Sequence, residues 1–149
     1  MSKVIKFKKL VEGSIVPSKP KEGDVGYDLH LFGVAKTTKQ MGKYQLSPEY
    51  HYIIKTGIAC ELPEGCWGLL KPRSGLSVHS GMSVLAGVVD NNYRGEICVI
   101  VTVKETIFLE EGDRIAQMVI MPEIIADVEV IDELSDSNRG AKGFGSSGK

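Results

Sequence analysis

The segment Pro72-Arg73-Ser74-Gly75 has the residue types of an anion-binding turn. Proline and glycine at this spacing are typical of a tight turn, and residues 76–82 are the one stretch with the apolar spacing of a short helix. Arg73 and Ser74 would then be exposed beside backbone N–H groups at the helix end. A guanidinium fork, a hydroxyl and free backbone donors together bind anionic oxygens. The segment therefore indicates an anion site, although such residues are also common in surface turns.

Two aspartates stand where a carboxylate could act on a ligand. Asp90 follows the apolar residues 87–89 and lies at the edge of an expected hairpin. Asp28 belongs to the alternating segment 25–31 and faces the side opposite to Tyr27, which is solvent or a cleft. Either carboxylate could be functional, and either could simply cap a turn or face solvent. The residue types alone leave both interpretations open.

The last fifteen residues, 135–149, have too little apolar surface to fold alone. Their glycine-rich backbone, Arg139 and the hydroxyls of Ser146 and Ser147 are suited to binding a terminal phosphate. Phe144 has no local core to join, so it either anchors the tail by packing or lies flat on a ligand base. We expect a tail that is either disordered or folded onto another surface.

Composition excludes several classes of protein. The net charge of -1 provides no basic field for a nucleic-acid backbone or an anionic membrane. No apolar run approaches the length of a membrane span, and lysines interrupt the first residues where a signal peptide needs an apolar stretch, so we expect a soluble, cytoplasmic protein. Three cysteines without a Cys-x-x-Cys pair suggest neither a disulfide framework nor a zinc site.

The elements that must position these residues are expected to be short strands. Apolar, β-branched or alternating runs bounded by Gly, Pro or Asp occur throughout the chain. They lie at residues 5–8, 25–31, 50–60, 67–70, 84–89, 97–103, 107–109, 115–121 and 128–131. One of them contains Gln117, which needs a polar partner if it is buried. About ten short strands and no long helix indicate an all-β sandwich, barrel or jelly roll.

Charge is distributed unevenly along the chain. Residues 1–43 carry nine lysines against four acidic residues, a net charge of +5, whereas residues 104–136 carry two basic and ten acidic residues, a net charge of -8. Solvated faces explain such a pattern, and so does an interface that places opposite charges across two subunits. The sequence leaves both interpretations open.

Five segments that carry these features lie in a characteristic order. They are Gly26-Tyr27-Asp28-Leu29, Pro72-Arg73-Ser74-Gly75-Leu76, Gly87-Val88-Val89-Asp90 with Tyr93-Arg94-Gly95, Gly112-Asp113-Arg114-Ile115-Ala116-Gln117, and Arg139-Gly140 with Gly143-Phe144-Gly145-Ser146-Ser147-Gly148. Together they resemble the five ordered motifs of the trimeric dUTP pyrophosphatases (dUTPases). The resemblance covers nearly the whole chain, and the ordered set is far more specific than any one segment.

The resemblance implies a role for each matching residue. Asp90 would be the general base that activates a water for attack on the α-phosphorus, and Asp28 would hold Mg²⁺ through water. The backbone at Gly87 and Val88 would read the uracil edge, while Tyr93 would pack beneath the deoxyribose. The other substrate-binding positions are Arg73, Ser74, Gly75, Gln117, Arg139, Phe144, Gly145, Ser146 and Ser147. Of these, Phe144 would cover the base, and Arg139 with the two serines would bind the γ-phosphate.

The resemblance also implies an architecture and a reaction. We expect a jelly-roll-like β-sandwich or barrel that forms a homotrimer, with a core at residues 1–134 and a flexible glycine-rich arm at residues 135–149 that closes over a site shared between subunits. The expected reaction is Mg²⁺-dependent hydrolysis of dUTP to dUMP and pyrophosphate, which limits uracil incorporation into DNA and supplies dUMP for thymidylate synthesis. The alternatives are a dCTP deaminase of the same superfamily and a non-catalytic nucleotide-binding jelly roll.

Overall fold

The computed structural model describes residues 3–143, which form twelve strands and one short helix. The strands are β1 (Lys6–Lys9), β2 (Gly26–His30), β3 (Gly33–Val34), β4 (Tyr44–Leu46), β5 (His51–Lys55), β6 (Ile58–Glu61), β7 (Cys66–Pro72), β8 (Ser83–Leu85), β9 (Val88–Val89), β10 (Cys98–Thr102), β11 (Ile107–Leu109) and β12 (Arg114–Pro122). The helix, α1 (Ser74–Ser80), follows β7 directly. The short helix expected at residues 76–82 therefore starts two residues earlier.

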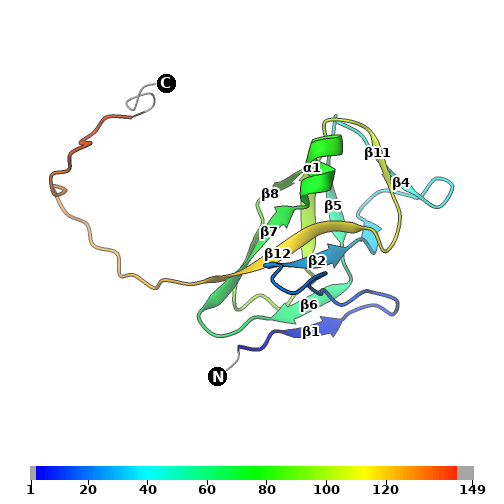
Figure 1. The fold of residues 1–149 in the computed structure, drawn as a ribbon, viewed down its shortest axis with the longest axis horizontal. Coiled ribbons are helices and arrows are strands. Elements are labelled where there is room, and N and C mark those ends of the chain that lie inside the picture. Colours follow the sequence, from blue (N-terminus) through cyan, green and yellow to red (C-terminus); the bar gives the residue numbers. More distant parts are fainter. Residues whose placement is uncertain (1–2, 144–149) are drawn as a thin grey trace.

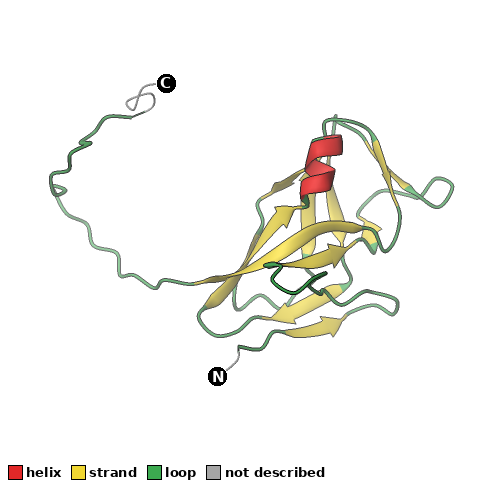
Figure 2. Ribbon diagram, viewed as in Figure 1, coloured by secondary structure: helices red, strands yellow, loops and turns green. Residues whose placement is uncertain are grey.

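The strands pair into two four-stranded and two two-stranded antiparallel sheets (Figure 1). The larger sheets have the strand orders β2-β12-β7-β9 and β3-β5-β10-β8, and the smaller ones pair β1 with β6 and β4 with β11. Figure 2 shows the single helix beside an otherwise all-β body. The predicted all-β, jelly-roll-like fold is confirmed. Within residues 3–143, no helix has the length and apolarity to span a membrane.

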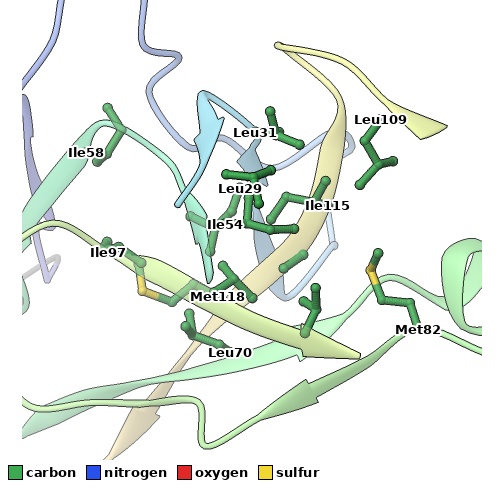
Figure 3. Close-up of a cluster of buried hydrophobic side chains, with 14 of the residues drawn as sticks. Leu29, Leu31, Ile54, Ile58, Leu70, Met82, Ile97, Leu109, Ile115 and Met118 are labelled. Carbon is green, nitrogen blue, oxygen red and sulfur yellow. The ribbon is translucent and has the colours of Figure 1, made fainter. Parts of the chain in front are cut away.

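One apolar core lies between the sheets (Figure 3). In β10, Val99 and Val101 have no exposed surface, whereas the alternate residues are only half-buried. Leu29 of β2, Ile54 of β5 and Met118 of β12 are also fully buried. This alternation is the period-two pattern that predicted strands, and the core it forms fixes which side chains remain at the surface.

Two expected strands are each divided by a turn with positive φ. The run 50–60 breaks at Gly57, with φ 69, into β5 and β6. The run 84–89 breaks at Ala86 and Gly87, with φ 56 and 100, into β8 and β9. Both turns lie inside runs rich in β-branched, aromatic or apolar residues, so periodicity alone did not reveal them. The second division places β8 and β9 in different sheets.

The strand expected at residues 128–131 does not form. The last strand, β12, ends at Pro122, and residues 123–143 run away from the body as an extended segment (Figure 1). Val128 and Val130 are each 94% exposed. An alternating segment becomes a strand only when a neighbouring strand supplies its hydrogen bonds, and no described strand lies beside this one. The prediction was wrong because it rested on local pattern alone.

Candidate functional site

Three elements bring the first group of predicted residues to one cavity. Strand β12 pairs with β2 on one side and with β7 on the other, so Gln117 is directly opposite Asp28. The end of β7 leads into α1 and carries Arg73 to the same place. The cavity has a volume of about 340 Å³. It is lined by Pro20, Asp24, Val25, Gly26, Asp28, Arg73, Ser74, Gly75 and Gln117. We call it the anion cavity.

Asp28 is the charged centre of the anion cavity. Its side chain is 8% exposed, and each carboxylate oxygen faces a different guanidinium group. Arg73 donates from Nε to Oδ1 at 3.1 Å, and Arg114 donates from Nη1 to Oδ2 at 3.5 Å. A nearly buried carboxylate requires such partners, because an unpaired buried charge is strongly destabilising. The sequence indicated roles for Asp28 and Arg73 but none for Arg114.

Gln117 is fixed by a backbone contact and by a glycine. Its Nε2 donates to the Pro72 carbonyl at 3.2 Å, which supplies the polar partner expected for a half-buried amide. A Cβ atom at Gly26 would lie 2.1 Å from Gln117 Oε1. Only glycine at position 26 therefore leaves room for this side-chain position.

His30 lies beside this charged group without adding charge to it. It is on the same face of β2 as Asp28, and its Nδ1 is buried without a hydrogen-bond partner among the described residues. Burial lowers the pKa of His30, although the nearby Asp28 carboxylate opposes this shift. The imidazole is consequently neutral at neutral pH, so the positive charge near the cavity comes from the arginines.

The second group of predicted residues lines a different cavity, which we call the hairpin cavity. It has a volume of about 310 Å³ and lies along the turn between β8 and β9 and the segment around Asp90, where the sequence predicted a hairpin. β8 pairs with β10 and β9 pairs with β7, so the two strands belong to different sheets, and we use the word hairpin for residues 87–96. The residues Gly87, Val88, Asp90 and Tyr93 all line it. Tyr93 donates from its hydroxyl to the Glu96 carbonyl at 3.0 Å. The cavity therefore combines exposed backbone, a carboxylate and an aromatic ring.

An asparagine anchors the segment that follows Asp90. Asn91 donates from Nδ2 to the carbonyls of Pro63 and Cys66, at 2.8 and 2.7 Å. Arg94 in turn donates from Nη1 to the Asn91 carbonyl at 2.7 Å. These bonds tie the hairpin to the turn between β6 and β7, and so hold Asp90 in place. Sequence analysis missed Asn91, since an asparagine in a turn gives no signal of its distant partners.

The two cavities share no lining residue among residues 3–143. Arg139 lies in neither cavity, because it belongs to the extended segment outside the body (Figure 1). The remaining predicted tail residues, Phe144, Gly145, Ser146 and Ser147, lie outside the described residues. One chain alone thus does not bring the predicted site residues together.

The donor set of the anion cavity suits a metal ion held indirectly. Within residues 3–143, no group of three or more His, Cys, Asp or Glu side chains could coordinate a metal. A carboxylate has about four lone-pair positions, so Asp28 can accept bonds from water while it binds both arginines. Mg²⁺ characteristically keeps several waters and uses few carboxylates. The residues present therefore fit a water-mediated Mg²⁺ contact but not direct coordination by a protein cage.

Comparison with known proteins shows the family of this chain. A protein-family model described as dUTPase matches residues 12–148. The chain belongs to the dUTPase family. Two relatives of this dUTPase chain are named deoxyuridine 5'-triphosphate nucleotidohydrolase. The protein of Paramecium bursaria Chlorella virus 1 is 40% identical, with 95% of each chain covered. The protein of Mus musculus is 37% identical, with 97% of this chain and 85% of the relative covered.

A solved structure extends the likeness to the fold. The dUTPase of Staphylococcus bacteriophage 80alpha, determined with dUPNHPP, superimposes with a TM-score of 0.83 and 28% sequence identity. The match covers 98% of this chain and 99% of the phage chain. The likeness therefore extends over the whole dUTPase fold, including the strands that line both cavities.

Proposed function

We propose that this chain hydrolyses dUTP to dUMP and pyrophosphate. The observation that carries the proposal is the anion cavity. It is lined by Arg73, Ser74 and Gly75, which follow β7, and by Asp28 of β2 and Gln117 of β12, which are directly opposite each other. The dUTPase family and the named activity of its relatives identify the anion as the triphosphate of a deoxyuridine nucleotide. In the cell, this reaction limits uracil incorporation into DNA and supplies dUMP for thymidylate synthesis. A cytoplasmic location stays a prediction.

The anion cavity binds the phosphate chain in this proposal. The Arg73 guanidinium, the Ser74 hydroxyl and the backbone at Gly75 contact phosphate oxygens, with the amide of Gln117 on the opposite side. These donors stabilise the negative charge that shifts onto the leaving pyrophosphate as the bond to the α-phosphorus breaks. Mg²⁺ fits here through waters on Asp28, and when bound it would neutralise charge on the phosphate oxygens.

The hairpin cavity binds the nucleoside and supplies the general base of the reaction. Backbone groups at Gly87 and Val88 pair with the uracil edge, and Tyr93 packs beneath the deoxyribose. The Asp90 carboxylate takes a proton from a water molecule, whose oxygen bonds to the α-phosphorus. The bond between the α-phosphorus and the bridging oxygen breaks, and pyrophosphate leaves with the electron pair.

The site is completed by more than one chain, in a homotrimer. Support comes from the separation of the two cavities within a single chain and from the exposed segment 123–143. This segment carries large apolar side chains that are 85 to 94% exposed, and a neighbouring subunit would cover them. These side chains are Ile124, Ile125, Val128, Val130 and Leu134.

The arm at residues 135–149 then closes over the site of a neighbour. Arg139, Ser146 and Ser147 bind the γ-phosphate there, Phe144 covers the uracil base, and Gly145 is a further substrate-binding residue. The opposite charges of residues 1–43 and 104–136 favour contacts between copies of the chain.

A turnover assay with dUTP and Mg²⁺ tests the proposed reaction. Release of pyrophosphate supports it, whereas release of ammonium from dCTP would indicate the related deaminase instead. Binding of nucleotide without turnover would indicate a non-catalytic protein.

The variant Asp90→Asn tests the assignment of the base. The amide is nearly isosteric but cannot accept the proton, so we expect kcat to fall by about 10² or more, with little change in nucleotide affinity. Affinity is measured with a non-hydrolysable dUTP analogue. Near-normal turnover in this variant would remove Asp90 as the base.

A further inference from the structure

Arg114 contacts the anion cavity's charged centre without lining the cavity. Its Nη1 group donates to Asp28 Oδ2, while Arg73 donates from Nε to the other oxygen of the same carboxylate. We propose that Arg114 is a positioning residue that acts through Asp28 to hold the Arg73 guanidinium in place for the phosphate chain. The inference rests on the proposed function for the identity of the ligand.

A β-bulge explains how Arg114 reaches Asp28. Gln117 is opposite Asp28 and Arg114 is opposite His30. The three residue steps from Arg114 to Gln117 in β12 therefore span only the two steps from His30 to Asp28 in β2. In a regular strand, residues three apart point to opposite faces. The register shift between Arg114 and Ala116 inserts one extra residue and places Arg114 and Gln117 on the same face. The bulge therefore aims a second guanidinium at Asp28.

The second guanidinium changes the charge that the cavity presents. A pair of Asp28 and Arg73 alone would be neutral, whereas the three residues together carry a net charge of +1. Asp28 is 8% exposed, so water screens these charges only partly. The excess positive charge is available to attract phosphate because Arg114 balances the carboxylate from the far side.

The contact with Asp28 also leaves the Nη groups of Arg73 available to a ligand. The hydrogen bond to Asp28 uses Nε, and in residues 3–143 the two Nη groups of Arg73 have no protein acceptor. The Arg73 side chain is 31% exposed and lines the cavity. A guanidinium held at Nε presents its remaining N–H groups as a fork, which matches the spacing of phosphate oxygens.

The expected signature is a loss of nucleotide affinity with little loss of chemistry. Arg114 lines neither the anion cavity nor the hairpin cavity, so its removal should weaken phosphate binding through Asp28 and Arg73 only. For Arg114→Gln we expect about a tenfold rise in KM and in the Kd of a non-hydrolysable dUTP analogue, with kcat within about threefold. Arg114→Lys should restore most of the affinity, because a single donor and its charge are enough to contact Asp28 Oδ2.

Two comparisons separate positioning from other effects. Lys104→Gln makes the same change in charge at a residue that lines another cavity, and we expect no change in affinity. In an Asp28→Asn background, Arg114→Gln should have little further effect, because the residue acts through Asp28. Circular dichroism melting of each variant reports stability separately from affinity.

Unchanged analogue affinity in Arg114→Gln, with or without a lower melting temperature, would overturn the inference. The inference is also overturned if Arg114→Gln lowers the affinity for the analogue as much in the Asp28→Asn background as in the wild-type protein, since Arg114 would then act directly on the ligand. If the wild-type protein does not hydrolyse dUTP, the proposed function fails separately. The inference is then judged on inorganic tripolyphosphate, for which the same tenfold loss and the same rescue by lysine are expected.

Discussion

At the scale of single residues, the anion cavity depends on residues whose substitution would disturb its geometry. The nearly buried carboxylate of Asp28 needs partners for both of its oxygens, and the two arginines supply them. The Gln117 side chain occupies the space that a Cβ at position 26 would fill, so this position requires glycine. Such contacts are short-range and geometric, so single substitutions should have large and specific effects.

Gly26→Ala should displace Gln117. The new Cβ would lie 2.1 Å from Gln117 Oε1, so the amide must move and lose its hydrogen bond to the Pro72 carbonyl. We expect a loss of stability of about 1–3 kcal/mol and weaker binding of the dUTP analogue. Gly33→Ala is the matched control, because its Cβ would have only an ordinary contact with Tyr44 at 3.7 Å. Equal melting temperatures and affinities in the two variants would contradict this account.

The thiol of Cys98 should be slow to alkylate. Burial raises the pKa of Cys98, and the neighbouring Glu96 carboxylate raises it further. Since the thiolate is the reactive form, the rate with iodoacetamide at pH 8 should be below that of the unfolded chain. The rate should keep rising above the pH at which an ordinary thiol is fully ionised. Mass spectrometry of timed samples measures this, and a rate equal to that of the unfolded chain would exclude the raised pKa.

At the scale of elements, the turn between β8 and β9 shows how a strained backbone creates a binding surface. Ala86 has φ 56, in a region that costs a non-glycine residue about 1 kcal/mol, and Gly87 has φ 100. A Cβ at Gly87 would lie 2.9 Å from the Leu70 carbonyl, so only glycine fits. The Gly87 carbonyl accepts a bond from Leu70 N at 2.7 Å, which fixes the turn against β7.

A fixed hairpin should discriminate strictly between nucleotides. A polar backbone edge that pairs with uracil is left unpaired by cytosine, so we expect kcat/KM for dCTP to be lower than for dUTP by several orders of magnitude. UTP should also be a poor substrate, because its 2′-hydroxyl would collide with Tyr93. Steady-state kinetics with the three nucleotides at equal Mg²⁺ measures this. Comparable rates would contradict both the base-reading and the sugar-reading assignments.

At the scale of the whole molecule, a single chain does not bring the predicted site residues together. The anion cavity, the hairpin cavity and the segment 123–143 occupy separate places, and this segment leaves the body after Pro122 (Figure 1). Within residues 123–143, large apolar side chains are left in water at a cost that a partner would remove. Closed three-fold assembly would bring one copy of each part to every site.

Mixing two inactive chains should restore activity. Asp90→Asn chains lack the base, and chains truncated before Arg139 lack the tail. After random reassortment from equal amounts, a working site needs its hairpin from a truncated chain and its tail from an Asp90→Asn chain. About one quarter of sites should then be active, because each condition is met in about half of them. If verified mixed trimers stay inactive, the hairpin and the tail come from the same chain.

The sequence by itself predicted most of the strands and indicated which residues could carry the chemistry. Alternation of apolar side chains is a local property, so it predicted β2 and β12, and the types of Asp28, Arg73 and Gln117 indicated an anion site. Tertiary structure alone decided which strands pair. That pairing placed Gln117 opposite Asp28, turned Arg114 onto the same face through a bulge, and left residues 128–131 without a partner. The reason is physical: a strand's hydrogen bonds come from distant residues, and local pattern does not specify them.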